Sequence, residues 1–154
     1  MLARTRLLFF AFLRWEVAGV LIAILLGFLA GLRTFTAPAV LWLMRRDSPF
    51  AYVLGVLALA EYVGDLFPKA PARTRPAGLI ARACSGAFCG WTAAALSGTP
   101  VAGAVLAGGA SAVIGAYVGL AARSRAITLV GRVPAGILED VITAAASVAV
   151  VAYL

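Results

Sequence analysis

Long apolar runs, separated by short clusters of charged residues, dominate the sequence. Five apolar segments can be drawn, at residues 17–44, 49–67, 77–97, 100–122 and 133–154. Each is close to or longer than the roughly 20 residues that a helix needs to cross about 30 Å of hydrocarbon. The pattern therefore predicts an all-α, polytopic membrane helix bundle with about five transmembrane helices, which together form one domain over residues 17–154.

The first sixteen residues form a stretch too short to cross a bilayer. Arg4, Arg6 and Arg14 stand among leucine, phenylalanine and tryptophan residues, which is typical of a helix lying in the membrane interface. We therefore expect residues 1–16 to form an N-terminal interfacial amphipathic segment. Arginines ahead of an apolar stretch also resemble a signal peptide, but no small-residue cleavage site follows, so we expect the segment to be retained.

The composition supports a membrane protein and argues against three other classes. The chain of 154 residues is 64% hydrophobic and only 12% charged, with a mean hydropathy of +1.04. An ordinary soluble domain is about half apolar and a quarter charged, so a soluble enzyme, a disordered chain and a nucleic-acid-binding domain all fit poorly. The chain lacks histidine, the commonest metal ligand. We therefore expect neither a metal site nor a cofactor.

The basic residues predict an orientation and a partner. The net charge is +7, and in a five-span arrangement most basic residues fall on one side: Arg4, Arg6, Arg14, Lys69, Arg73, Arg75, Arg82, Arg123, Arg125 and Arg132. The other side has only Arg45 and Arg46. Because cytoplasmic loops are enriched in Lys and Arg, this predicts a cytoplasmic N-terminus and an external C-terminus. We expect Lys69, Arg73 and Arg75 to contact anionic headgroups on the cytoplasmic side, or a partner.

Arg33 is the most informative single position. Residues 17–44 would make a straight helix of about 42 Å, too long for one perpendicular span, and Arg33 lies in its middle. Pro38 removes a helical hydrogen bond, while the hydroxyls of Thr34 and Thr36 can bond the freed carbonyls. The first span is therefore predicted to be kinked or broken at residues 33–38, as in transporters. The alternative is a long tilted helix whose Arg33 extends to the headgroups.

Four carboxylates are the candidate partners of Arg33. Glu61 and Asp65 are four residues apart and so share one helical face. A carboxylate within a span is costly unless it is paired, hydrated or protonated, so this pair can carry protons or bind a cation. Asp65 can instead lie at the interface and pair with Lys69 or Arg73. Glu139 can meet Glu61 or Arg33, whereas Asp140 can simply complement a helix dipole.

Rows of glycines four residues apart predict close helix packing. The rows are Gly27 with Gly31, Gly86 with Gly90, and Gly115 with Gly119. Such rows let helices approach closely, either within the bundle or between copies in a homo-oligomer.

Short motifs in a consistent order resemble a known family. They are Gly31-Leu32-Arg33 followed by Pro38, Glu61 followed by Asp65 and Pro68, Arg75-Pro76 leading to Gly86, and Leu138-Glu139-Asp140. Together, over about residues 25–145, they resemble the bacterial membrane family known as domain of unknown function four-one-two-six. The resemblance implies a compact helical membrane fold, and Arg33, Glu61, Asp65, Glu139 and Asp140 are positions that the family motifs share. It carries no activity to transfer, and the family's aspartate-lysine pair before the proline is absent here.

We expect a multi-pass protein of the bacterial cytoplasmic (inner) membrane and weigh three functions. The first is a small channel or an ion- or proton-coupled transporter that uses the Arg/Glu cluster. The second is a structural or accessory protein that organises lipid or a partner, in which buried ion pairs only set helix register. The third is an enzyme acting on a lipid or isoprenoid, with the two acidic pairs binding magnesium pyrophosphate. We adopt the first and do not expect an enzyme.

Overall fold

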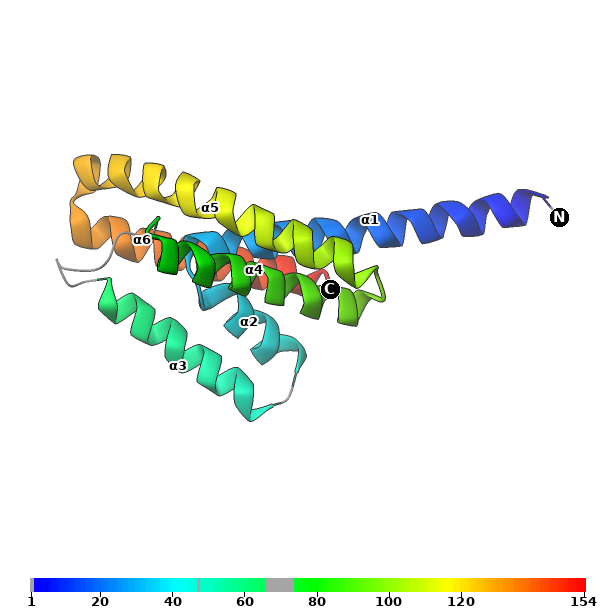
Figure 1. Ribbon diagram of the computed structural model, residues 1–154, viewed down its shortest axis with the longest axis horizontal. Coiled ribbons are helices and arrows are strands. Elements are labelled where there is room, and N and C mark those ends of the chain that lie inside the picture. The colour runs from blue at the N-terminus through cyan, green and yellow to red at the C-terminus, as the bar shows by residue number, and fades with distance from the viewer. Residues whose placement is uncertain (1, 47, 66–73) are drawn as a thin grey trace.

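Helices make up nearly all of the structure, a computed structural model that describes residues 2–46, 48–65 and 74–154, with side chains from residue 17 onward. The helices of the described part are α1 (Leu2–Leu32), α2 (Thr36–Arg45), α3 (Pro49–Gly64), α4 (Pro76–Ser97), α5 (Val101–Val130) and α6 (Arg132–Ala152). Figure 1 shows α1, α4, α5 and α6 side by side, with α3 on the outside of α2. The predicted all-α bundle is confirmed.

The first helix runs without a break through the predicted boundary at residue 16. Its early turns extend beyond the rest of the bundle (Figure 1), by about 22 Å for residues 2–16 at 1.5 Å per residue. The structure therefore contains no separate N-terminal helix in its described part. An interfacial position for residues 1–16 stays a prediction.

The apolar run at residues 17–44 is a helical hairpin and not one crossing. The helix breaks after Leu32 and restarts at Thr36, at the predicted place. However, α1 runs parallel to α5, because Gly27 lies against Gly108 and Gly31 against Ala112. In contrast, α2 runs parallel to α6, since Arg33 pairs with Asp140 near the start of α6 and Arg45 donates to Val151 near its end. The single first span was wrong because the break reverses the chain.

This reversal decides which residues lie at each end of the bundle. The helices alternate in direction from α1 to α6, so the bundle has a charged end, which contains the helix break, and an opposite end. Gly19 of α1 contacts Thr99, in the turn between α4 and α5, and Leu154 closes α6 at that same opposite end. Gly19 and Leu154 therefore lie at the same end of the bundle, whereas the five-span prediction counts residues 17–44 as one crossing. The positions of the N- and C-termini relative to a membrane stay a prediction.

Backbone-to-backbone packing of α1, α4 and α5 forms the centre of the bundle. A methyl group added at Gly27 would overlap the carbonyl oxygen of Gly108, and one added at Gly86 would overlap the same oxygen. Added methyl groups at Gly31 and Gly90 would meet the backbone of α5 in the same way. The predicted glycine rows are therefore contacts within the chain, which require no second copy.

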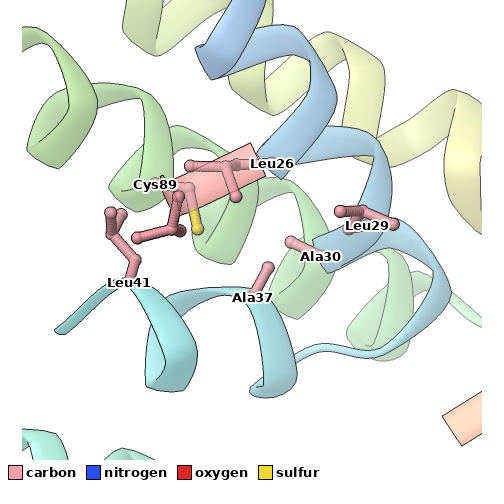
Figure 2. Close-up of a cluster of buried hydrophobic side chains, with 7 residues drawn as sticks. Leu26, Leu29, Ala30, Ala37, Leu41 and Cys89 are labelled. Carbon is pink, nitrogen blue, oxygen red and sulfur yellow. The ribbon is translucent and has the colours of Figure 1, made fainter. Parts of the chain in front are cut away.

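A small apolar core lies where α2 meets this centre. Figure 2 shows Leu26, Leu29 and Ala30 of α1 facing Ala37 and Leu41 of α2, with Cys89 of α4 beside them. Val151 of α6 completes the cluster. Leu26, Leu29 and Leu41 fill the space that the small alanine side chains leave, so one face of α2 is packed on the bundle.

Within the described residues, three helices are long and apolar enough to cross a membrane: α4, α5 and α6. The described part of α1 from Val17 and all of α3 are shorter apolar helices, and α2 spans only about 15 Å over its 10 residues. The structure therefore supports three candidate spans with shorter apolar helices packed on them, and does not confirm five full spans. Large apolar side chains are exposed on α1, α3, α5 and α6, as expected for surfaces in contact with lipid.

Candidate functional site

The break between α1 and α2 places three polar residues in the interior. Arg33 is 1% exposed, and Thr34 and Thr36 are also buried. The α1 helix closes with a hydrogen bond from Arg33 N to Leu29 O at 3.0 Å. Pro38 is the third residue of α2, where a backbone N–H would have no helical partner. The proline therefore fits the start of the new helix without the loss of a hydrogen bond.

Side chains from α3 and α4 satisfy the backbone groups that the break leaves without helical partners. The Glu61 carboxylate accepts from the backbone N–H of Thr34 at 2.9 Å and of Phe35 at 3.1 Å. Arg82 Nε donates to Gly31 O at 3.0 Å, and Ser85 Oγ donates to Thr34 O. Glu61 and Arg82 are themselves 3.6 Å apart. A negatively charged carboxylate thus lies at the start of α2 and a positively charged guanidinium at the end of α1, as helix dipoles favour.

Arg33 is the centre of an ion-pair network. Its guanidinium pairs with Asp65 at the end of α3, with Asp140 at 2.5 Å and with Glu139 at 3.8 Å. Its Nε is buried and makes no hydrogen bond in the described structure. Arg33 therefore joins the α1–α2 break to α3 and α6 through charge, and keeps one donor that is not committed to a protein acceptor.

A second arginine serves the same carboxylates from another helix. Arg123 of α5 lies 2.6 Å from Asp65 and 3.3 Å from Glu139. Asp65 thus lies between two guanidinium groups. We define the charge cluster as Arg33, Arg82 and Arg123 with Glu61, Asp65, Glu139 and Asp140. Its carboxylates are 13 to 23% exposed, so the cluster is mostly shielded from the surroundings.

Two hollows adjoin the charge cluster. One, of about 10 Å³, is lined by Arg33, Asp65, Arg123 and Asp140 and has room for about one water molecule. The other, of about 190 Å³, has mostly apolar walls from α1, α5 and α6 and ends at Arg123 and Glu139. Tyr62 lines the smaller hollow, with its ring 5.5 Å from the Arg33 guanidinium and its hydroxyl 2.8 Å from Thr36 Oγ1.

The structure brings together all five charged residues that the sequence singled out. Asp140 pairs directly with Arg33, so it does more than complement a helix dipole. Glu139 lies 3.8 Å from the Arg33 guanidinium and 3.3 Å from that of Arg123, so it meets Arg33 as predicted. Glu61 forms an ion pair with Arg82 and accepts hydrogen bonds from the backbone of the helix break, whereas Asp65 forms an ion pair with Arg33. The shared helical face of Glu61 and Asp65 therefore serves two different arginines.

The predicted lipid contacts are only partly described. Lys69 and Arg73 lie outside the described residues. The predicted pairing of Asp65 with one of them therefore stays a prediction. Arg75 is exposed immediately before α4, in a position that leaves its side chain accessible to a headgroup. The lipid contact of this loop stays a prediction.

Sequence reasoning missed Arg82 and Arg123 as members of the site. Both were counted as loop charges that set orientation, yet both have side chains about 90% buried. A signal was present for Arg82, which lies within the apolar segment that begins at residue 77. Arg123 follows Gly119 by one helical turn on a buried face, but only the packing of the bundle brings it beside Asp65 at the end of α3 and Glu139 of α6.

The carboxylates of the charge cluster lie beside arginines. Among the described residues, no group of three or more His, Cys, Asp or Glu side chains has the arrangement of a metal site. The arginines lie between the acids and form ion pairs with Asp65, Glu139 and Asp140.

Comparison with protein-family models, with curated proteins and with solved structures finds no match to this chain. The resemblance to domain of unknown function four-one-two-six rests on its motifs and stays a prediction. The long apolar helices, their exposed apolar faces and the buried ion pairs define a helical membrane protein with a charge cluster at a broken helix.

Proposed function

We propose that the protein is a small ion- or proton-coupled transporter, with the charge cluster as its coupling site. The observation that carries this proposal is Arg33, a fully buried cation at a helix break that pairs with carboxylates from both α3 and α6. Charged residues inside membrane bundles are expensive and mark ion or proton paths. Broken helices at such charges are a recurrent feature of transporters.

The attachment of α3 supports a moving part. This helix packs mainly on α2, and its buried residues are only Ala51, Leu54 and Ala58. Its links to α4 and α5 are the edge-to-face contact of Phe50 with Phe88, and the ion pairs of Glu61 with Arg82 and of Asp65 with Arg123. A proton or a cation on these carboxylates would weaken those ion pairs. The α2–α3 hairpin would then shift on the rigid centre formed by α1, α4 and α5.

A transporter fits better than an open channel. The interior where α1, α4 and α5 meet is filled by backbone contacts at Gly27, Gly86 and Gly90. The cavity beside Arg33 holds only about one water molecule. Conduction would therefore require a change of conformation, as in alternating access.

We place the protein in the bacterial cytoplasmic membrane with the charged end toward the cytoplasm. This end contains Arg75, Arg123, Arg125 and Arg132, and segments rich in Lys and Arg stay inside. In this orientation α1 enters from the outer side, and Leu154 lies on that side as well.

Flux measurements test the transport proposal. Purified protein in proteoliposomes is given an imposed pH gradient, with common cations and anions screened in turn. We expect flux in the wild type, loss in Asp65→Asn and Arg33→Ala, and no change in Glu16→Gln, a matched acid-to-amide substitution far from the break. Absence of flux from folded wild-type protein, or equal flux in Asp65→Asn, would refute the proposal.

A second candidate is a non-transporting accessory protein, and the closed interior favours it. Buried ion pairs can fix helix register without moving ions, and the charge cluster joins α1 to α3, α4, α5 and α6 in this way. Under this alternative, neutralising Asp65 lowers stability while no condition produces flux. Folded wild type without flux would therefore favour the accessory role.

A further inference from the structure

A long apolar groove lies on the side of the molecule away from α5. It has a volume of about 420 Å³ and is lined by Thr36, Ala39, Val40, Leu43, Tyr52, Gly55, Val56, Ala58, Leu59, Tyr62 and Ala144. These residues come from α2, α3 and α6, and we name this feature the hairpin groove. Most of its walls are small or aliphatic, and Tyr52 and Val56 on its rim are strongly exposed.

A basic hollow continues the groove at the opposite end of the bundle. It measures about 320 Å³ and is lined by Leu43, Met44, Arg45, Arg46, Ser48, Ala51 and Tyr52. Leu43 and Tyr52 line both features, so the groove and the hollow adjoin. Together they form one depression with an apolar body and a polar, cationic head.

The basic hollow has the chemistry of a phosphate site. Arg46 is exposed, and its guanidinium is held 6.0 Å from the centre of the Trp42 ring. Arg45 is anchored at the same place by its hydrogen bond to Val151 O at 2.7 Å. Ser48 caps the start of α3, where the helix dipole adds positive potential. The exposed Arg46 guanidinium beside a helix N-terminus favours a phosphate anion. Arg45, whose Nε and Nη2 donate to carbonyls at the end of α6, adds positive charge beside it.

The length of the hairpin groove fits a lipid chain in one leaflet. From Tyr52 to Tyr62 along α3 the rise is about 15 Å, which equals half of the roughly 30 Å hydrocarbon thickness. A chain that starts at the basic hollow would therefore run from the headgroup level to about the bilayer centre. Tyr52 would lie at the interface, where tyrosine is enriched in membrane proteins.

We propose that the hairpin groove and the basic hollow together bind one anionic phospholipid, with its phosphate at Arg46 and Ser48 and one acyl chain between α2 and α3. The charge of the hollow selects an anionic headgroup, and the apolar groove selects a chain. The bound lipid fills the space beside α3, the helix with the least packing in the bundle. The basic hollow lies at the end opposite the charge cluster, and the hairpin groove runs from it toward Thr36 and Tyr62. The proposal does not depend on transport.

Native mass spectrometry of the full chain in detergent tests the site directly. Phosphatidylglycerol and phosphatidylcholine with identical chains are added in turn, and bound lipid is counted. We expect phosphatidylglycerol to bind more tightly, and Arg46→Ala to weaken its binding by about tenfold, the effect of one charged hydrogen bond. Arg125→Ala removes an exposed arginine at the charged end and serves as the matched control without effect.

A second pair of variants tests the groove. Gly55→Leu adds a side chain to the hairpin groove, where the nearest atom to the new Cβ is Leu43 Cδ1 at 3.9 Å. We expect it to reduce binding of both lipids, while Gly103→Leu, with no atom within 4 Å of its Cβ, leaves binding unchanged. Val56→Phe fills the same groove from an exposed position and replaces Gly55→Leu should that variant not fold.

Three results would overturn the proposal. Equal binding of the two lipids would remove the headgroup site. Unchanged phosphatidylglycerol binding in Arg46→Ala would do the same. Binding that is lost in Arg46→Ala but retained in the folded groove variants would reduce the feature to a surface phosphate contact without a chain site.

Discussion

The centre formed by α1, α4 and α5 and the hairpin formed by α2 and α3 are held together in different ways. In the centre, glycines allow backbones to touch, as where Gly31 meets Ala112. In the hairpin, α3 is packed on α2 by a few residues, meets α4 through Phe50 and Phe88, and is joined to the other helices through the ion pairs of Glu61 and Asp65. Close packing is rigid and insensitive to conditions, whereas ion pairs can exchange partners. The difference locates the part of this molecule that is able to move.

Substitution of a glycine at the backbone contacts is expected to cause the largest loss of stability. In Gly31→Ala the new methyl group would overlap Ala112 O and lie 2.8 Å from Ala116 N, both backbone atoms that cannot turn aside. We expect a loss of at least about 3 kcal/mol in the free energy of unfolding, measured by denaturant titration in detergent and followed by circular dichroism. A loss below about 1 kcal/mol would mean that α1 and α5 are not in rigid contact.

Removal of the Arg33 guanidinium is expected to cause the next largest loss of stability. Arg33→Ala leaves Asp140 and Asp65 buried with less compensation, and we expect a loss of about 3 kcal/mol in the same unfolding measurement. The double variant Arg33→Ala, Asp140→Ala should recover part of that loss, because it removes one of the uncompensated charges. Additive losses in the double variant would show that the two residues do not interact.

Neutralisation of Glu61 should act locally. Glu61→Gln weakens the cap on Thr34 and Phe35 and the pairing with Arg82, at an expected cost of about 1 to 2 kcal/mol. Hydrogen exchange should become faster at the amides of Thr34 and Phe35. Glu139→Gln provides the control, since Glu139 has no described bond to these amides. Equal exchange in both variants would contradict the role of Glu61 as a cap.

The hydrogen bond between Tyr62 and Thr36 contributes less. Tyr62→Phe keeps the ring beside Arg33 but removes the hydroxyl that lies 2.8 Å from Thr36 Oγ1. We expect a cost of about 1 kcal/mol, seen as a small decrease in the denaturant midpoint. Thr36→Val should give a similar change, and the two together should cost little more than either alone. Fully additive costs would indicate that each hydroxyl has a different partner.

Gly55→Ala is expected to change the stability least, and it is the counterpart in the hairpin of Gly31→Ala in the centre. In Gly55→Ala the new methyl group meets only Leu43 Cδ1 at 3.9 Å, and alanine favours a helix over glycine by up to about 1 kcal/mol. We expect stability to stay equal or to rise by that amount. If Gly55→Ala and Gly31→Ala were equally destabilising, the contrast between the hairpin and the centre would be lost.

The sequence alone predicted the helical membrane class, the helix break and the five charged residues that meet. These follow from local properties. Apolar runs of about 20 residues have few alternatives to helices in lipid, a buried arginine followed by a proline disfavours a continuous helix, and a charge in an apolar segment requires a partner. Arg33, Glu61, Asp65, Glu139 and Asp140 could therefore be selected before any contact was known.

Only the tertiary structure decided how the chain turns at the break and which charges pair. A helix that stops at Leu32 and restarts at Thr36 can continue onward or reverse, and hydropathy is the same in both cases. The reversal depends on Glu61 and Arg82, which arrive from α3 and α4 to satisfy the broken backbone. Because these contacts join residues distant in sequence, no local pattern predicts them. The direction of α1 and the pairing of Arg123 with Asp65 and Glu139 likewise depend on the tertiary structure.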